Sequence, residues 1–412
     1  MTSPASSSPE SSDPAAPRGR LRTLAMAVVQ TVVFGVLFFG AAELVARYVF
    51  GFRPLTPGTF LFEHEPRRGW THQRSADELF VKLGFQTPIR INSKGLRERE
   101  IPYEKPAGTF RVLVIGDSNV AGFEVGEDET FTRVTESLLR ERGYNVEFLN
   151  GGHRGYGTDQ SLLFLMDEGM KYQPDLVLYF WSDNDVDDNV TVHRPFRRYG
   201  KGWFDVDQSG ALVLNGVPVP EFPYDQGIQV GDDGQLRKLD VPPLLRATVF
   251  LRDELTLHSG FATFLVWAVA QLPSAENTVL GASTFGDFRE QGGVQPDLDT
   301  QSRRFRLTLA VVREMERVAE QGGARLQLIG IGGPWANTLR AEAGMPELHD
   351  WDRYVERIPG DGSTVRTPFD PHWNALGNRL YAEELAEILV ESGLVPPSLA
   401  SEAPTAATAA SR

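Results

Sequence analysis

The stretch that decides the fold reads Arg111-Val112-Leu113-Val114-Ile115-Gly116-Asp117-Ser118. Its apolar part is a continuous run, which is typical of a strand in a sheet that is covered on both faces. Similar short runs lie at residues 146–149 and 176–180, and helical spacing separates the runs at residues 130–141 and 161–170. Strands that alternate with helices predict a parallel α/β sheet.

Residues 190–297 break this rhythm, and we interpret them as an insertion that covers or borders the functional site. Within it, Leu212 to Val217 is expected to form a hairpin, because the Asn215-Gly216 pair favours a two-residue turn. Residues 260–270 are apolar but too short to span a membrane, so they predict a core or lid helix, with an interfacial membrane contact as the alternative.

The α/β rhythm then returns, with a helix expected at residues 304–320, a strand at 326–331 and a last helix at 378–391. Together these elements predict one three-layer α/β/α domain over residues 109–395. Residues 52–108, rich in Pro, Arg and Gly, are expected to form a connecting segment with short strands.

The N-terminal region carries a candidate membrane anchor, placed at residues 21–50. Its apolar core, residues 24–42, is about long enough to cross ~30 Å of hydrocarbon as a helix. Arg18, Arg20 and Arg22 precede it, which predicts a cytoplasmic N-terminus and a domain outside the cytoplasm, periplasmic or extracellular. A cleaved signal peptide and a buried soluble helix are the alternatives. The first usually has a shorter apolar region, and the second usually has a polar face.

Both ends of the chain are rich in small and polar residues. Residues 1–20 and 396–412 contain few large apolar side chains. Such segments cannot bury enough surface to offset the entropy lost on ordering, so both are expected to be disordered tails, the first of them cytoplasmic.

The composition excludes several classes of function. The formal net charge of −14 over 412 residues disfavours a nucleic-acid partner, which usually needs a basic face. The chain has no cysteine, which rules out disulfides, thiol nucleophiles and thiolate metal sites. No histidines are paired as in zinc-binding H-E-x-x-H motifs, so neither a metal nor a cofactor is expected.

Four polar blocks lie at strand ends or helix starts. They are Gly116-Asp117-Ser118, Asn150 to Gly157, Ser182 to Asp185, and Asp370-Pro371-His372-Trp373-Asn374. The carboxyl ends of parallel strands share one edge of a sheet, where open α/β folds bind their ligands, so all four blocks can converge there. In this order they resemble the SGNH/GDSL hydrolase family, over about residues 90–190 and 300–392.

The resemblance implies a role for each matching residue. Ser118 matches the nucleophile, His372 the general base and Asp370 the carboxylate that orients it. The backbone N–H groups of Ser118 and Gly155 and the side chain of Asn184 match the three donors of the oxyanion hole. Such chemistry needs these groups, because a serine hydroxyl is a poor nucleophile until a base takes its proton.

The chain departs from the family pattern at two positions. Ser182 replaces the glycine of the G-x-N-D block, and Phe369 occupies the usual aspartate position of D-x-x-H. The resulting D-x-H-W-N spacing resembles membrane-linked relatives that modify polysaccharides, including alginate O-acetyltransferase-like proteins.

The resemblance implies an esterase that forms an acyl-enzyme on Ser118 and acts on an acylated carbohydrate, such as an O-acetylated glycan, or on a lipid ester. An O-acyltransferase would use the same residues with a sugar hydroxyl in place of water. An inactive domain that binds glycan or a partner protein is the alternative from another class.

Three other features have plainer interpretations. His153 could be a second base, but we expect it only to line the pocket. The acidic run Asp183, Asp185, Asp187 and Asp188 fits no calcium loop and is expected to be a solvated loop. Residues 92–97 are expected to form a turn with a packing role.

Overall fold

The computed structural model describes residues 17–56, 60–182, 184–222, 226–239, 241–271, 299–330 and 334–397. Its centre is a sheet of four parallel strands in the order β6-β5-β7-β13. The strands are β5 (Phe110–Gly116), β6 (Val146–Asn150), β7 (Leu176–Trp181) and β13 (Arg325–Gly330). Each of the three expected core strands before the insertion is confirmed, and so is the one after it.

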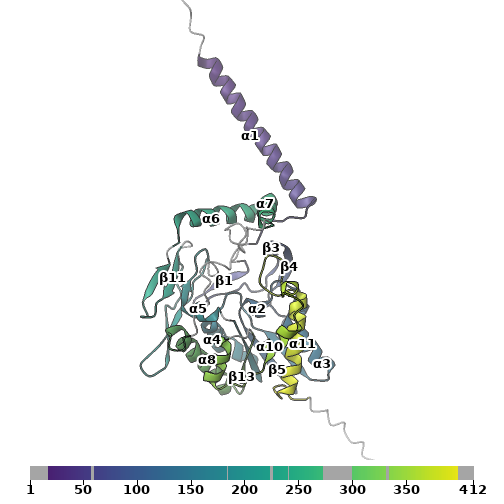
Figure 1. The fold of residues 1–412 in the computed structure, drawn as a ribbon, viewed down its shortest axis with the longest axis vertical. Coiled ribbons are helices and arrows are strands. Elements are labelled where there is room, and N and C mark those ends of the chain that lie inside the picture. Colours follow the sequence, from purple (N-terminus) through teal and green to yellow (C-terminus); the bar gives the residue numbers. More distant parts are fainter. Residues whose placement is uncertain are drawn as a thin grey trace, which may run out of the picture.

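Helices cover both faces of this sheet, so the expected three-layer α/β/α fold is confirmed (Figure 1). Successive side chains of β5 point to opposite faces of the sheet, so they contact the two helix layers in turn. Leu113 and Ile115 enter one buried core with the helices α4 and α8, whereas Val112 and Val114 enter the other core with α3 and α11. The four helices are α3 (Phe131–Glu141), α4 (Thr158–Asp167), α8 (Arg303–Gln321) and α11 (Ala375–Glu391).

The segment before the sheet forms two antiparallel hairpins that pack on the domain. Phe80 and Ile89 of this segment share a small core with Ala121 and Phe123, which follow the first core strand. The connecting segment therefore supports the turn after β5 directly. The strands are β1 (Phe62–Glu65), β2 (Gly69–His72), β3 (Asp77–Lys82) and β4 (Phe85–Arg90).

The described part of the insertion contains short strands and two helices. β10 pairs with β9, and the turn between them is formed by residues 207–211. The expected hairpin around Asn215-Gly216 is therefore wrong, because Leu212 to Asn215 pairs with the strand before it and Val217 follows outside that sheet. The strands are β8 (Thr191–His193), β9 (Trp203–Val206), β10 (Leu212–Asn215), β11 (Gly227–Val230) and β12 (Leu236–Leu239).

The two helices of the insertion lie on the side of the domain from which the N-terminal helix leaves (Figure 1). They are α6 (Pro243–His258) and α7 (Gly260–Ala270), and α7 begins and ends where the sequence pattern placed a helix. The remaining helices are short: α2 (Ser118–Ala121), α5 (Asp185–Val190), α9 (Pro334–Ala343) and α10 (Asp350–Arg357).

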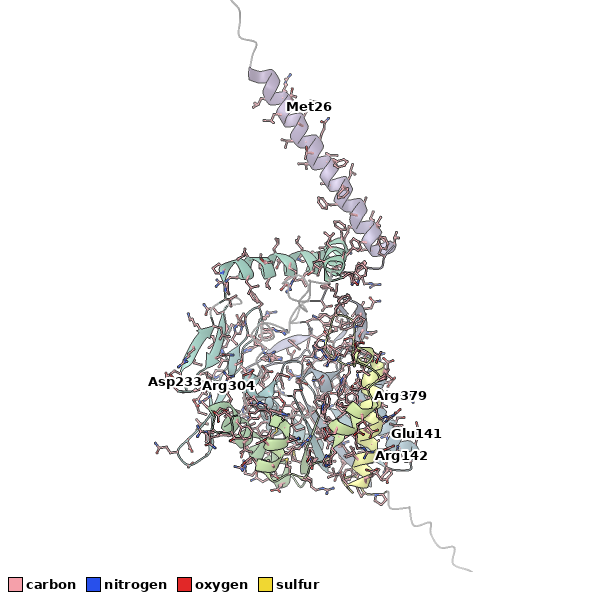
Figure 2. The ribbon with its side chains drawn as sticks, viewed as in Figure 1. Met26, Glu141, Arg142, Asp233, Arg304 and Arg379 are labelled. Carbon is pink, nitrogen blue, oxygen red and sulfur yellow. The ribbon has the colours of Figure 1, made fainter. Side chains whose placement is uncertain are left out.

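The N-terminal helix α1 (Pro17–Tyr48) projects away from the domain and contacts it near its C-terminal end, at α7. Residues 21–48 are long and apolar enough to cross a membrane and none of their apolar window is buried inside the protein. Figure 2 shows Met26 on this helix, well away from the sheet. Because α1 begins at Pro17, residues 17–20 are helical rather than part of a disordered tail. Most of both expected tails, residues 1–16 and 398–412, lies outside the described residues.

Candidate active site

The turn after β5 presents Ser118 at the start of α2. Gly116 has a φ of +154°, and a Cβ there would lie 2.9 Å from the carbonyl oxygen of Phe180, so only glycine fits. Asp117 caps α2 by accepting a hydrogen bond from the N–H of Asn119 at 2.8 Å. These local constraints bring the Ser118 side chain to the carboxyl edge of the sheet, where it is half-buried.

Arg97, from the turn expected to have a packing role, holds this serine turn from behind. Its guanidinium is buried and donates to the carbonyl oxygens of Ala121, Gly122 and Val125. The cation thus satisfies backbone carbonyls at the end of α2 and in the loop that follows it. The packing role of residues 92–97 is confirmed, and Arg97 is the residue that carries it.

The structure brings together the three residues expected to form a catalytic triad. Ser118 and His372 are 254 positions apart, yet the Ser118 Oγ lies 2.7 Å from the His372 Nε2. The His372 Nδ1 donates to Asp370 Oδ1, and the same oxygen accepts the His372 backbone N–H at 3.0 Å. Since Nδ1 carries a proton toward the carboxylate, the neutral form of the imidazole keeps Nε2 as the acceptor that faces the serine hydroxyl.

Asp370 reaches the His372 ring from only two residues away because the loop of residues 367–372 folds back on itself. The Thr367 N–H donates to the His372 carbonyl at 3.0 Å, which folds residues 367–372 into a closed loop. Asp370 can then bond both the backbone and the ring of His372. Phe369, at the family's usual aspartate position, is more than one-third exposed and adopts a left-handed backbone conformation with φ of 59°.

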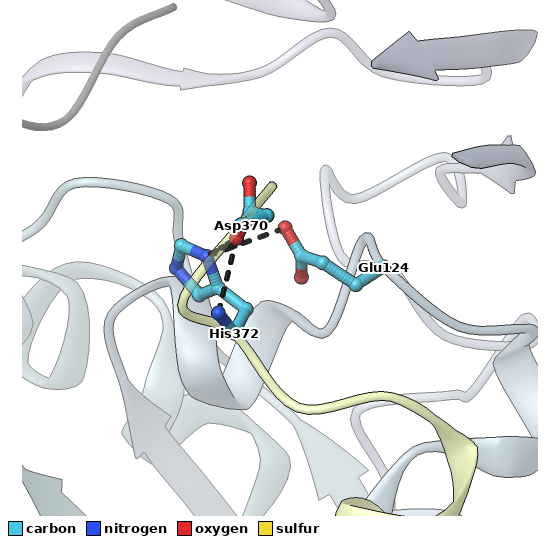
Figure 3. Close-up of side chains that lie close together, drawn as sticks. All are labelled: Glu124, Asp370 and His372. Atoms are coloured by element: carbon cyan, nitrogen blue, oxygen red, sulfur yellow. Dashed lines mark hydrogen bonds and ion pairs between the residues drawn. The ribbon is translucent and has the colours of Figure 1, made fainter. Parts of the chain in front are cut away.

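A second carboxylate, which sequence reasoning missed, lies beside the same imidazole. The Glu124 Oε1 lies 3.7 Å from the His372 Nδ1, and the Glu124 side chain is only 1% exposed. Figure 3 shows Glu124 and Asp370 directed at the same edge of the ring. Arg154 donates to Glu124, and its guanidinium lies over the rings of Phe80 and Phe123. The two carboxylates thus lie near the positive charges of Arg154, His372 and Lys82.

This surrounding charge decides the protonation of His372. Burial alone disfavours the imidazolium, but Glu124 and Asp370 outweigh it and raise the pKa of His372 to about 9. Burial also favours a neutral Asp370, but the charge of His372 and of Arg154 holds the pKa of this carboxyl well below its usual range. At neutral pH the pair is therefore an imidazolium and a carboxylate.

The same three residues, Glu124, Asp370 and His372, lie close enough together to hold a metal ion. Their existing partners disfavour that use. Arg154 already bonds to Glu124, and the His372 Nδ1 already donates its proton to Asp370. A divalent cation would have to displace both contacts and lie beside a buried guanidinium, so the cluster is better suited to acid–base chemistry.

Two backbone N–H groups are the expected oxyanion donors. Within the described part of the chain, the N–H groups of Ser118 and Gly155 donate to no protein acceptor. Gly155 has a φ of +78°, and a Cβ there would have Trp70 and Arg194 as its nearest neighbours, no closer than 3.7 Å. The position is thus open enough for a bound group to approach the backbone.

Asn184, the third expected oxyanion donor, lies at the N-terminus of α5 and is exposed. Its Nδ2 donates to the Asp188 Oδ2 at 2.7 Å, which engages one of the two amide protons. This contact fixes the side chain within one helical turn. The role of Asn184 as an oxyanion donor stays a prediction.

His153 is a packing residue rather than a group that meets a substrate. It is 1% exposed, its Nδ1 donates to the Gly151 carbonyl at 3.0 Å, and its Nε2 faces the Thr71 hydroxyl at 3.3 Å. Its ring stacks between those of His72 and Tyr156. Burial and the neighbouring His72 keep its pKa well below the usual value. Because both nitrogens are engaged, a role as second base is excluded.

The acidic run after β7 is not a solvated loop, and that expectation is wrong for the residues that the structure describes. Asp185 and Asp188 are buried. Asp185 accepts hydrogen bonds from the Tyr179 hydroxyl and the Ser182 N–H, and Asp188 forms an ion pair with Arg194. These contacts anchor α5 below the site. Asp183 lies outside the described residues.

Comparison with known proteins gives only distant similarities. No family model matches the chain, and neither does any curated protein. Among solved structures, "TesA" is 12% identical, with 68% of this chain and 97% of that chain covered and a TM-score of 0.34. The psychrotrophic esterase EstA from Pseudoalteromonas sp. is 10% identical, with 69% and 98% covered and a TM-score of 0.32.

A GDSL-like lipase from Bacteroides thetaiotaomicron is 12% identical, with 68% of this chain and 88% of that chain covered and a TM-score of 0.29. Two of these three proteins are named as an esterase and a lipase. Similarities this distant do not carry the site residues or substrates of those proteins over to this chain.

Proposed function

We propose that the protein is a serine ester hydrolase of the SGNH/GDSL type. The observation that carries this proposal is the continuous hydrogen-bonded chain from the Ser118 Oγ through the His372 ring to the Asp370 carboxylate. A serine hydroxyl within reach of an imidazole that a carboxylate orients is the arrangement that nucleophilic acyl transfer requires.

The proposed reaction has two halves. Ser118 Oγ attacks the ester carbonyl carbon while His372 Nε2 takes the hydroxyl proton, and the carbonyl oxygen becomes an oxyanion. The ester C–O bond then breaks, and His372 returns its proton to the leaving alcohol, which leaves an acyl group on Ser118. Water attacks that acyl group with the same proton transfers and releases the carboxylic acid.

The oxyanion formed in each half needs donors at the carboxyl edge of the sheet. Ser118 N–H and Gly155 N–H are suited to this, because no protein acceptor occupies them within the described residues. Asn184, at the N-terminus of α5, is proposed as the third donor because it matches the asparagine of the G-x-N-D block. Losing one such donor typically costs about 10²–10³ in kcat.

We also propose that α1 anchors the enzyme in a membrane with the catalytic domain outside the cytoplasm. The support is the exposed, apolar helix Leu21–Tyr48 and the arginines that precede its apolar core. The ester substrate is then one met outside the cytoplasm, an acylated carbohydrate or a lipid.

The test of the proposed activity is turnover of p-nitrophenyl esters, from acetate to palmitate, by the full chain in detergent micelles. We expect hydrolysis well above the rate without enzyme, and the preferred chain length identifies the acyl group. A folded protein that is inert on the whole series would contradict ester hydrolysis. The remaining alternatives would then be acyl transfer to a glycan hydroxyl and a binding role. Adding an acyl donor and a glycan acceptor and measuring the mass of the product would distinguish them.

Glu124→Gln should move the pH dependence of hydrolysis. Only neutral His372 accepts the serine proton, so kcat/KM should rise with pH through a midpoint near the His372 pKa of about 9. Removing the Glu124 charge destabilises the imidazolium, which should shift this midpoint down by about 1–3 pH units. Gln keeps an acceptor oxygen for Arg154, and Asp128→Asn, at an exposed position four residues further along the chain, serves as the matched control. An unchanged midpoint in the Glu124 variant would show that this carboxylate does not tune the base.

A further inference from the structure

We infer that α6 and α7 lie in the membrane interface and hold the catalytic domain against the bilayer, with lipid as the partner of their exposed apolar face. This inference rests on membrane insertion of α1, proposed above, and not on ester hydrolysis. It assigns an interfacial contact to the insertion. From the sequence, residues 260–270 of this insertion are expected to form a core or lid helix, with a membrane contact as the alternative.

The first support is that the end of α1 is bonded directly to the start of α7. The Glu43 carboxylate accepts hydrogen bonds from the Ser259 hydroxyl at 2.7 Å and from the N–H groups of Gly260 and Phe261, both at 2.9 Å. Arg47 of α1 also donates to the His258 carbonyl at 3.2 Å. The first N–H groups of a helix have no partner within that helix, so a carboxylate that accepts them binds the helix to the element that carries the carboxylate. Here Glu43 binds the start of α7 to α1.

The second support is depth. If residues 24–42 cross the hydrocarbon, Glu43 lies at its outer boundary and Phe39 about one helical turn inside. The Phe39 ring lies 6.3 Å from the Phe261 ring, and the Phe50 ring lies 5.9 Å from the Phe264 ring. The N-terminal half of α7 is therefore at the level of the boundary. With 11 residues, α7 is too short to cross the membrane.

The third support is the outward face of α6. Leu244, Leu251 and Leu255 are 80%, 59% and 52% exposed, and their spacing of seven and four residues places them on one stripe of the helix. The opposite stripe contains Val249 and Thr256, which are buried. A helix that turns leucines away from its own domain, beside a membrane-spanning helix, has the form of an interfacial helix.

The contact would hold the active site near the membrane surface. The Thr256 carbonyl of α6 accepts the Leu55 N–H at 2.8 Å, and the Thr56 N–H donates to the Val81 carbonyl of β3 at 2.8 Å. At the β3–β4 turn, a Cβ built on Gly84 would lie 3.0 Å from Phe369, which immediately precedes Asp370. A short chain of packed segments thus runs from α6 to the catalytic loop, and Figure 1 shows α6, α7, β3 and β4 on the side of α1.

The test uses single-cysteine variants of the full chain, which has no cysteine of its own. Leu251→Cys and Leu255→Cys would carry a nitroxide label in lipid nanodiscs. Collision with oxygen, which concentrates in lipid, is compared with collision with a water-soluble nickel complex. Phe34→Cys on α1 is the lipid reference, and Arg379→Cys on α11, far from α6 in Figure 2, is the water reference.

We expect the labels at positions 251 and 255 to have an oxygen-to-nickel ratio several-fold above that at 379 and close to that at 34. Ratios equal to that at 379 would show a face in water and overturn the inference. Low collision with both reagents would show a face covered by protein, a second copy included, and would overturn it equally. A nickel-accessible label at 34 would remove the membrane insertion on which it rests. None of these outcomes depends on ester hydrolysis.

Discussion

Ser118→Ala and His372→Ala should each lower kcat for ester hydrolysis by at least about 10³-fold, and Ser118→Ala should leave the thermal unfolding midpoint nearly unchanged. Ser118→Ala removes the atom that forms the acyl-enzyme, and His372→Ala removes the only base within hydrogen-bond distance of that atom in the described structure. The double variant should lose no more than either single variant, since the two groups act in one proton transfer. Initial rates on the best p-nitrophenyl ester measure all three losses.

The control for this prediction is Ser137→Ala, an exposed serine of α3 that bonds only to Glu141 of its own helix. It should retain wild-type activity. If Ser118→Ala keeps more than about one-tenth of the wild-type rate, water attacks the ester without a serine nucleophile and the proposed mechanism is wrong.

Asp370→Asn should lower kcat by about 10³–10⁴-fold, the loss expected when a neutral amide replaces the carboxylate that orients the base. The amide is isosteric, but it no longer compensates the imidazolium and can present an N–H where Nδ1 donates a proton. The pKa of His372 should fall, since one of the two carboxylates that raise it is lost. The midpoint of the pH dependence of kcat/KM should therefore move to lower pH, and the maximal kcat/KM reached at high pH should fall.

Glu124→Gln is the matched comparison for this result. Glu124 lies 3.7 Å from Nδ1, whereas Asp370 is hydrogen-bonded to it, so only the Asp370 variant should lose the tautomer as well as the charge. A loss on Asp370→Asn no larger than on Glu124→Gln would assign the orienting role to Glu124 instead. That outcome would also explain why the D-x-x-H spacing of the family is absent here.

The fold was predictable wherever one local pattern decided it. Short continuous apolar runs such as Val112 to Ile115, rich in β-branched residues, are typical of strands buried on both faces, and the structure buries these residues fully. The Asn215-Gly216 signal failed because Asn-Gly allows a tight turn without requiring one. The preceding strand β10 found a better partner in β9, which lies on its other side in the sequence.

The site residues that lie in short motifs at strand ends or helix starts could be predicted from the sequence. Residues that matter through charge contacts formed only in the folded chain could not. Ser118, His372 and Asp370 lie in short blocks with recognisable neighbours, and the structure brings them together. Glu124 lies in the aperiodic loop after Ser118, and its importance comes only from its approach to His372 and Arg154 in the folded chain. No local pattern marks such a residue. Asp185 and Asp188 are the opposite case. A run of acidic residues predicts a solvent-exposed loop, and only the folded chain shows the partners with which these two side chains are buried.

The central claim, that Ser118 is an activated nucleophile, is tested most directly by labelling the full chain with a fluorophosphonate and mapping the modified peptide by mass spectrometry. We predict one adduct, on Ser118, that forms faster as the pH rises toward about 9, the pKa of His372. Ser118→Ala should lack it, and His372→Ala should form it far more slowly. An ester-hydrolysing wild-type protein that carries no adduct on Ser118, or a Ser118→Ala variant that is labelled equally, would contradict the account.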